Sequence, residues 1–277
     1  MPSIAGVMVS ETTNWYVECG CGRVTPWSMT FEYVDVETAK TARGTRLIVN
    51  ALVPSPWSEA MKGLVVLAEL PAVAVRRGLD AAAIDAWTGI DNAPSLIHDR
   101  EPIRSNWAAI VGFVARMAPR ILPSELAARA DAMGTLDVLA GENGVGWNAR
   151  LAMIDASTET RGFPPPIAKY LGKRYGYSKD AIAGARARIV EQLDHVASKL
   201  TGDYFGGATP NAIDVYSATF LTPIAGALTE TDCPGMLPPL RAAFALAAAA
   251  FGPSVPPALL EHRERMFTRH LVRPILL

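Results

Sequence analysis

The sequence predicts an α/β domain over residues 46–118, an all-α domain over residues 119–277, and a β-rich extension over residues 1–45. Short apolar runs alternate with amphipathic helical patterns as far as Ala118-Pro119, and strand signals stop beyond that point. Half of the 277 residues are hydrophobic and 19% are charged, so the chain can bury a substantial core.

The elements of residues 46–118 follow from periodicity and turn residues. "RLIVNAL" is rich in β-branched and apolar residues, which is typical of a buried strand. A helix follows up to Pro71, because one face is apolar, with Trp57, Ala60, Met61, Leu64, Val65 and Ala68. "AVAVR" predicts a strand, "LDAAAIDAW" a helix, "PSLIHD" and "EPIR" a hairpin around Asp99-Arg100, and "SNWAAIVGFVARMA" a helix. The order β-α-β-α-β-β-α is that of a thioredoxin-like domain.

The residues beyond Pro119 read as helical. "SELAARADAMGTLDVLAG" predicts a helix with Ser124 as its N-cap. "SKDAIAGARARIVEQLDHVASKL" predicts one amphipathic helix whose apolar face holds Ile182, Ala185, Ile189, Leu193, Val196 and Leu200. In "NAIDVYSATF", Asn211 can cap a helix while Asp214 reaches back, a variant of the capping box that we interpret as structural.

The extension contains two predicted strands, "NWYVECGCGRV" and "WSMTFEYVDV", joined at a Thr25-Pro26 turn as a β-hairpin. Cys19 and Cys21 lie two residues apart in the first strand. A metal site needs about four ligands, and no matching Cys/His pair follows. We therefore predict free thiols and no metal site, with thiol redox chemistry or metal binding as the weaker alternative.

Composition and charge exclude several classes of function. The net charge is −1 and no basic stripe is present, which argues against nucleic acid as a partner. The N-terminus lacks the features of a signal peptide, and "AAFALAAAAFG" is too short to span a bilayer. Three cysteines do not make a disulfide framework. We expect a soluble, cytoplasmic protein that does not bind membranes.

The stretch "SPWS", residues 55–58, directly follows the first predicted strand of the α/β domain. Ser55 suits an N-cap and Pro56 suits the first helical position, so helix capping alone would explain it. Its place at the carboxyl end of a strand, where ligands of α/β sheets gather, also makes Ser55 a candidate site residue. The N-terminus of a helix, with its free N–H groups, favours a bound anion.

"SPWS" has the spacing of a Cys-Pro-x-Cys redox motif, with serine at both sulfur positions. Serine cannot form a disulfide, so two-cysteine redox chemistry is excluded there. The Ser55 hydroxyl can donate a hydrogen bond to a bound thiolate, which contributes about 1.5–3 kcal/mol. The helix dipole adds about 0.3–1 kcal/mol. At about 1.36 kcal/mol per pKa unit, the pKa of a thiol near 8.5 would fall below about 7. The sequence therefore predicts that Ser55 activates a thiol supplied by a cosubstrate, while Ser58 is structural.

Two further stretches carry candidate site residues. In "NAPSLIH", Pro94 precedes a strand, where an edge position or a cis bond accommodates proline. A cis bond there would leave the Ala93 backbone free to pair with an extended peptide, and an ordinary strand-entry proline is the alternative. In "GENGVGWNARLAMID", Trp147 and Arg150 mark either a helix–helix junction or a wall of the substrate pocket.

The chain resembles the glutathione S-transferase superfamily over roughly residues 46–277. The resemblance rests on "SPWSEAMKGL", "WTGIDNAPSLIHDREPIRSNWAAI" and "GDYFGGATPNAIDVYSATF". It is nearest to the serine-type, Tau-like members and to a group of uncharacterised bacterial proteins that end much like "LLEHRERMFTRHLVRPILL". The resemblance implies glutathione as cosubstrate and a homodimer joined at the junction of the two domains.

The resemblance also implies roles for individual residues. Ser55 corresponds to the residue that activates the glutathione sulfur, Ala93-Pro94 to the backbone clamp on the cysteinyl group, and Ser105 to the residue that binds the γ-glutamyl carboxylate. Arg104 stands where the family usually has an acidic residue. An arginine cannot pair with the γ-glutamyl amino group, but it can hold a carboxylate.

Two functional hypotheses follow. The first is an enzyme that activates glutathione through Ser55 and conjugates it to, or isomerises, a small electrophile, with Trp147 and Arg150 in the electrophile pocket. The second is a binding protein that kept the fold and lost the cosubstrate, which Arg104 and the extension before Arg46 favour.

Overall fold

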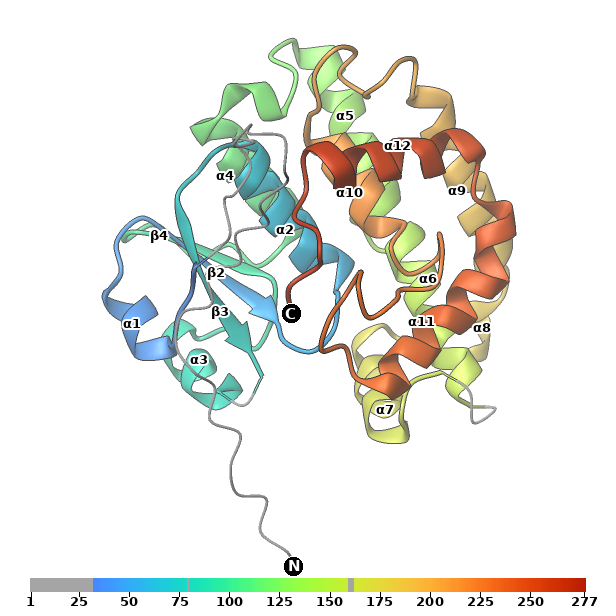
Figure 1. The fold of residues 1–277 in the computed structure, drawn as a ribbon, viewed down its shortest axis with the longest axis horizontal. Helices are drawn as coiled ribbons and strands as arrows, with labels where there is room; N and C mark the ends of the chain where they lie inside the picture. The colour runs from blue at the N-terminus through green and yellow to red at the C-terminus, as the bar shows by residue number, and fades with distance from the viewer. Residues whose placement is uncertain (1–31, 79, 159–161) are drawn as a thin grey trace, which may run out of the picture.

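The computed structural model describes residues 32–78, 80–158 and 162–277 (Figure 1). The strands are β1 Glu32–Tyr33, β2 Thr45–Asn50, β3 Ala72–Arg77 and β4 Ser95–His98. The helices are α1 Val36–Thr41, α2 Pro56–Leu67, α3 Ala81–Thr88, α4 Trp107–Met117, α5 Leu126–Ala140, α6 Val145–Ser157, α7 Pro165–Arg174, α8 Lys179–Ile182, α9 Ala185–Lys199, α10 Ala212–Phe220, α11 Pro238–Phe251 and α12 Pro257–Arg269. Single 3₁₀ turns span Pro119–Ile121 and Gly252–Ser254. An α/β half followed by a helical half confirms the predicted fold class.

The sheet has the strand order β1-β3-β2-β4. β3 runs parallel to both β1 and β2, and β4 runs antiparallel to β2. β2 pairs along its whole length with β3, from Thr45 opposite Ala72 to Asn50 opposite Arg77. Five of its six residues are buried, because helices cover both faces of this central strand.

Alternate residues of β2 serve two separate cores. Leu47 and Val49 pack into the large core under α2 and α4. Ile48 points to the other face, where Val36 of α1 and Ile84 of α3 enclose a smaller core. This period-two alternation explains why a continuous apolar run forms a strand here.

The described part of the extension joins the sheet. β1 pairs with β3 at Glu32–Val73 and Tyr33–Ala74. The strand predicted over residues 27–36 stops at Tyr33, because the Asp35 side chain accepts a hydrogen bond from Thr38 N (2.7 Å) and caps α1. The first predicted strand of the hairpin lies outside the described residues, and the domain boundaries at residues 45 and 118 stay predictions.

The predicted hairpin around Asp99-Arg100 is only partly regular. β4 forms its first arm, but the second arm contributes a single bridge, in which Leu96 and Arg104 exchange two backbone hydrogen bonds of 2.8 and 3.0 Å. Pro102 lacks an N–H group, so a continuous ladder cannot form through "EPIR".

The helical half corrects two local predictions. Glu125, not Ser124, caps α5, because its carboxylate accepts hydrogen bonds from Ala127 N (2.9 Å) and Ala128 N (2.7 Å). The helix predicted over residues 178–200 is divided into α8 and α9 at Gly184, which has a φ of 72°. Its apolar face is confirmed where it matters for packing, with Ala185, Ile189, Leu193 and Val196 buried.

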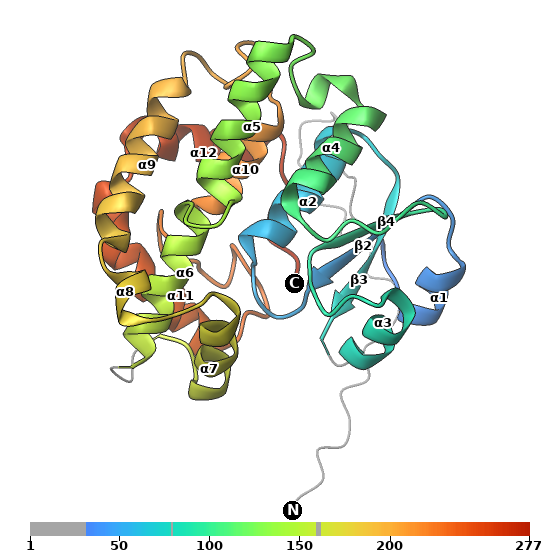
Figure 2. The ribbon, with the colours of Figure 1, turned by 180° about the vertical axis from the view of Figure 1, so that it is seen from behind.

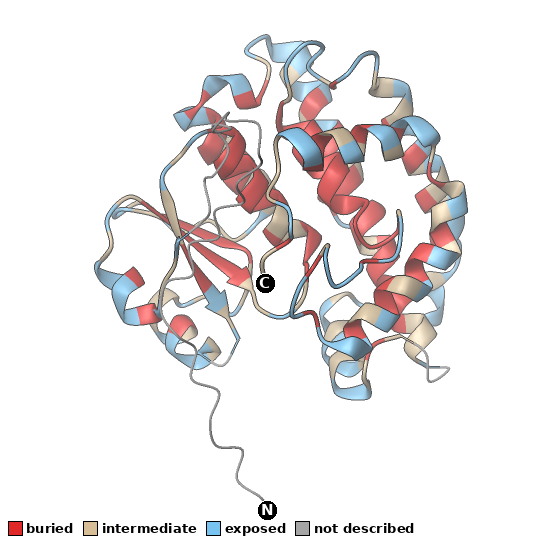
Figure 3. Cartoon of the chain, in the orientation of Figure 1, coloured by how far each residue is buried: buried red, intermediate tan, exposed pale blue. Residues whose placement is uncertain are grey.

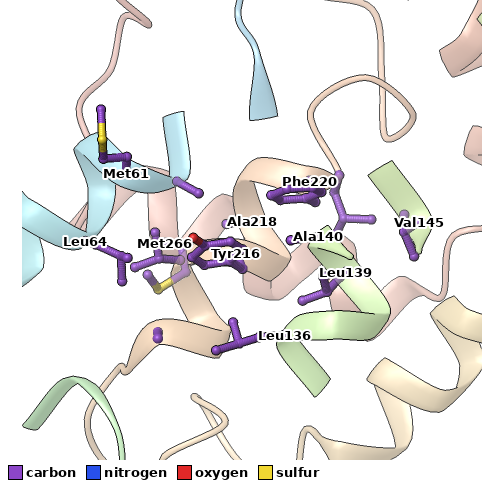
Figure 4. Packing of buried hydrophobic residues seen from close by; sticks show 14 of the residues in the cluster. Met61, Leu64, Leu136, Leu139, Ala140, Val145, Tyr216, Ala218, Phe220 and Met266 are labelled. Atoms are coloured by element: carbon purple, nitrogen blue, oxygen red, sulfur yellow. The ribbon is translucent and has the colours of Figure 1, made fainter. Parts of the chain in front are cut away.

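Helices α2 and α10 join the two halves of the molecule. Both are buried along nearly their whole length (Figure 3). A Cβ added at Gly63 of α2 would lie 2.7 Å from Val215 Cγ1 of α10 and 2.8 Å from Leu271 Cδ2, so glycine permits this close approach. Figure 4 shows Tyr216 of α10 between Leu64 of α2 and Leu139 of α5, with Phe220 on the side of Ala140 and Val145.

The C-terminal segment, residues 273–277, crosses from the helical half to the sheet (Figure 1). The Leu276 carbonyl oxygen accepts hydrogen bonds from Lys62 Nζ (2.8 Å) and the Tyr33 hydroxyl (3.2 Å). Lys62 also forms a buried ion pair with Glu59 at 2.8 Å. The segment thus connects α2 with the extension. Within the described residues, no helix is long and apolar enough to cross a membrane.

Acid should loosen this segment. Asp232 accepts hydrogen bonds from Arg273 Nη2 (2.8 Å) and from Thr229, and these bonds lower the pKa of the Asp232 carboxyl to about 2. Because the folded-state pKa lies below the reference value of 3.8, this stabilisation is present above about pH 4 and is lost as the pH falls toward 2. We expect Asp232→Asn to remove at most about 2 kcal/mol of pH-dependent stability. Urea unfolding of both proteins between about pH 5 and pH 2 measures this, and equal pH dependence would contradict it.

Candidate active site

Ser55 lies where β2 has ended and α2 begins. The turn is held by hydrogen bonds from Ser55 N to Val53 O (2.8 Å) and from Glu59 N to Ser55 O (2.9 Å). Ser55 has the extended backbone of an N-cap, and Pro56 is the first helical residue, as predicted. However, the Ser55 hydroxyl makes no capping hydrogen bond, and it bonds to no other described residue. The side chain is 6% exposed and lines a cavity.

The cavity has a volume of about 700 Å³. Loops that follow β2 and precede β4 and α4 form its sheet side, and α6, α7 and the start of α11 form its helical side. Figure 2 shows the loop into α2 between the sheet and α7. This size and position, at the carboxyl end of the central parallel strands, are typical of a small-molecule site.

Ala93, Pro94 and Ser105 line the same cavity as Ser55. The Ala93-Pro94 peptide bond is cis, one of the two arrangements expected from the sequence. The Ala93 N–H donates to no described residue, and the Ser105 hydroxyl is likewise unbonded within the described chain. The fold therefore brings four predicted site residues together with free polar groups.

Arg104 does not line the cavity. Its guanidinium pairs with Glu101 Oε2 at 2.6 Å, donates to Pro102 O at 3.0 Å, and lies 4.5 Å from the centre of the Phe113 ring. Hydrogen bonds from Arg116 and Arg104 lower the pKa of the Glu101 carboxyl. Arg104 would have to leave Glu101 to reach a ligand, so the geometry gives no support to the predicted cosubstrate contact.

Trp147 and Arg150 of α6 both line the cavity. The same segment is also a helix–helix junction, because a Cβ at Gly146 would lie 2.5 Å from the Phe220 ring and 3.0 Å from Trp57. The stretch "GENGVGWNARLAMID" is therefore both a helix–helix junction and a wall of the cavity. The aromatic wall continues at Tyr175, whose ring centre lies 4.7 Å from that of Trp147.

Sequence reasoning missed several polar residues of this cavity, and Asn50, Asn92 and Arg174 are those with a bonding partner that shapes it. Asn50 donates to Ser58 Oγ at 3.2 Å and, more weakly, to the Ala93 carbonyl oxygen at 3.5 Å. Ser58 is thus structural, as predicted, and it orients Asn50. Asn92 lines the cavity and accepts a hydrogen bond from Arg174 of α7, across the opening between the halves. Asn50 could have been identified from the sequence, because it is the polar residue that ends the apolar run "RLIVN". The hydrogen bond between Asn92 and Arg174 could not, because it depends on how the two halves pack together.

The predicted thiol and metal features stay untested. Cys19 and Cys21 lie outside the described residues. Across the described residues, no group of three or more His, Cys, Asp or Glu side chains could hold a metal ion. The third cysteine, Cys233, is fully buried, and burial raises the pKa of its thiol to about 11, which makes it a poor nucleophile.

The arrangement defines the class of fold. A thioredoxin-like sheet is joined to a helical domain whose α10 carries the predicted capping box, and a serine at the start of α2 faces the cavity between them. This is the glutathione S-transferase fold.

Solved structures agree with this assignment. A glutathione S-transferase of Methylobacterium radiotolerans, in complex with glutathione sulfonate, matches with a TM-score of 0.55 and 17% identity over 81% of this chain and 91% of its own. Human glutathione S-transferase T1-1 matches with a TM-score of 0.53 and 16% identity over 82% of this chain and 84% of its own. A Sulfitobacter homologue with bound glutathione reaches 0.51 and 17% identity over 82% and 94%. No protein-family model and no curated protein sequence matches. The Tau-like assignment stays a prediction.

Proposed function

We propose that this protein ionises the thiol of glutathione at Ser55 and transfers the sulfur to a small electrophile. The observation that carries this proposal is the buried Ser55 hydroxyl, which caps nothing and faces the cavity at the N-terminus of α2. The structures of the Methylobacterium and Sulfitobacter proteins contain glutathione sulfonate and glutathione, which supports the choice of cosubstrate.

The reaction balances without a further reactant. The glutathione thiol releases its proton to solvent, and the Ser55 O–H and the amides at the start of α2 stabilise the thiolate. The sulfur then forms a bond to an electrophilic carbon, and a leaving group departs with its electron pair. In an isomerisation, the new sulfur–carbon bond breaks again and glutathione is regenerated.

The sheet side of the cavity offers the remaining contacts for glutathione. The free Ala93 N–H suits the cysteinyl backbone, and the Ser105 hydroxyl suits the γ-glutamyl carboxylate. With Arg104 held by Glu101, Asp91 is the acidic side chain on this side of the cavity that is available to the amino group. A homodimer remains an expectation from the resemblance, and a cytoplasmic location remains an expectation from the composition.

Replacing Ser55 tests the proposal. The Ser55→Ala protein should bind glutathione but hold its thiol at a pKa of about 8.5, so turnover below pH 7 should fall about 10- to 100-fold. The pKa of bound glutathione, read from the ultraviolet absorbance of the thiolate, separates loss of ionisation from loss of binding. Unchanged turnover and thiol pKa would contradict the role of Ser55.

Stability provides the control for this variant. Because the Ser55 side chain makes no capping bond, Ser55→Ala should leave the melting temperature nearly unchanged. Asn211→Ala, which removes a true cap bond to Ile213 N (2.8 Å), should cost about 1 kcal/mol. If calorimetry finds no glutathione binding at millimolar concentrations, the non-catalytic binding protein becomes the better hypothesis.

A further inference from the structure

Arg150 is a buried cation with no hydrogen-bond or ion-pair partner among the described residues. It is 6% exposed, yet its guanidinium forms no ion pair or hydrogen bond with any described residue. The centre of the Phe163 ring lies 5.3 Å from the guanidinium carbon. Buried charges in proteins are normally paired, so an unpaired one at a cavity wall requires an explanation.

The other strongly buried arginine and lysine of the described chain have protein partners, although Arg46 Nε is unbonded. Lys62, also 6% exposed, pairs with Glu59, and Arg46, again 6% exposed, donates to the Ala42 and Asp99 carbonyl oxygens. Arg150 differs from both because it lines the cavity. None of its nitrogens is both fully enclosed and unbonded, so the guanidinium is partly accessible at the cavity that Arg150 lines. With no partner among residues 32–78, 80–158 and 162–277, Arg150 is positioned to bind a group inside the cavity.

The residues around Arg150 indicate what class of ligand it binds. Arg150 lies on the helical side, with the aromatic rings of Trp147, Phe163 and Tyr175, opposite the sheet side that holds Ser55 and Ser105. Polar groups suited to a peptide gather on the sheet side. The helical side instead combines apolar walls with two cations, Arg150 and Arg174, and one carboxylate, Glu142. Arg174 is held by Asn92, so Arg150 is the unbonded cation on this side, which suits an unsaturated or aromatic body carrying an anion.

We propose that the electrophile is a carboxylic acid whose carboxylate is held by Arg150, a specificity that rests on the proposed glutathione chemistry at Ser55. The planar guanidinium matches a carboxylate in a bidentate geometry. Arg150 thus fixes one end of an aromatic or conjugated acid, and the aromatic wall of the helical side leaves its reactive carbon directed toward the sulfur on the sheet side.

A matched pair of electrophiles tests this proposal. A chlorodinitrobenzoate and its neutral methyl ester both react with a thiolate, which displaces chloride and forms a sulfur–carbon bond. Relative to the uncatalysed rates, the acid-to-ester ratio of kcat/KM should fall about 10- to 100-fold in Arg150→Met and Arg150→Gln, mainly through KM. Arg150→Lys should keep part of the preference for the acid. Lys169→Met, which removes an exposed cation of α7 that does not line the cavity, is the control and should leave the ratio unchanged.

Two measurements separate this proposal from the proposed function. Calorimetry with nitrobenzoate alone, without glutathione, should show binding to the wild type that Arg150→Met abolishes, whatever the Ser55 variant shows. The melting temperature of Arg150→Met should not fall, since no internal partner is lost. An unchanged acid-to-ester ratio would overturn the proposal. So would a loss of glutathione affinity in Arg150→Met with the ratio intact, because Arg150 would then serve a carboxylate of the cosubstrate.

Discussion

Replacing Asp214 by alanine is expected to lower the free energy of unfolding by about 3–5 kcal/mol. The side chain is fully buried, and its two oxygens accept three hydrogen bonds: from Phe205 N (2.9 Å), Asn211 N (2.8 Å) and His262 Nε2 (2.8 Å). Alanine would leave all three donors unsatisfied in the core. It would also detach the start of α10 from α12, and α10 is the helix on which α2 packs.

The asparagine variant sharpens this test. Asp214→Asn keeps one acceptor oxygen but places an amide NH₂ group against a backbone donor, so we expect roughly half the loss seen with alanine. Asp203→Asn is the control, because that exposed carboxyl forms only a 3.6 Å surface pair and its loss should cost less than about 0.5 kcal/mol. Chemical denaturation measures all three variants. A change below about 1 kcal/mol in Asp214→Ala would contradict a structural role for this network.

Lys62→Met should be similarly destabilising, by about 3–5 kcal/mol. It removes the partner of the buried Glu59 carboxylate and the donor that holds the Leu276 carbonyl oxygen. Burial raises the pKa of Glu59 even in the wild type, while Lys62 opposes that shift, so the unpaired carboxyl should have a still higher folded-state pKa.

The sign of the pH dependence follows from that shift. A raised carboxyl pKa means that the folded state takes up the proton more readily, so the variant should lose stability as the pH rises above about 4.5. The difference from the wild type should therefore be smaller near pH 4 than near pH 8. A double variant, Glu59→Met with Lys62→Met, should recover much of the loss, because an apolar pair often replaces a buried ion pair at little cost. A constant difference across pH would indicate that packing, not charge, is responsible.

Local patterns predicted the fold well where local physics decides it. β2, α2 and the capping box of α10 follow from residue periodicity and cap residues within a few positions of one another. The glycine at position 184 and the proline at position 102 are local signals for the helix break and for the irregular arm of the hairpin. The prediction followed the continuous apolar pattern around them instead. The pairing of β1 with β3 joins residues about forty positions apart, and no local pattern specifies it.

Part of the candidate site could be predicted from the sequence, but the hydrogen bonds of its side chains could not. Sequence patterns placed Ser55 at the carboxyl end of a strand and Ala93 before another strand, the resemblance added Ser105, and the fold brings all three to one cavity. Whether the Ser55 hydroxyl caps α2 or faces the cavity depends on a rotation of one side chain. Likewise, Arg104 is satisfied by Glu101 and Arg150 is satisfied by nothing described, a contrast that exists only in three dimensions.

The C-terminal segment also sets the order in which the protein can be completed. The bond from Lys62 to Leu276 joins residues 214 positions apart. At a synthesis rate of 5–20 residues per second, about 10–40 s separate the two residues on the ribosome. During that time Lys62, the partner of Glu59, lacks its hydrogen bond to the Leu276 carbonyl oxygen. The thioredoxin-like half is therefore made first, but it reaches its final state only after the chain has been made through residue 276. The thioredoxin-like half, which carries Ser55, therefore depends on the C-terminal segment for its last contacts. Activity should appear only after the whole described chain has folded.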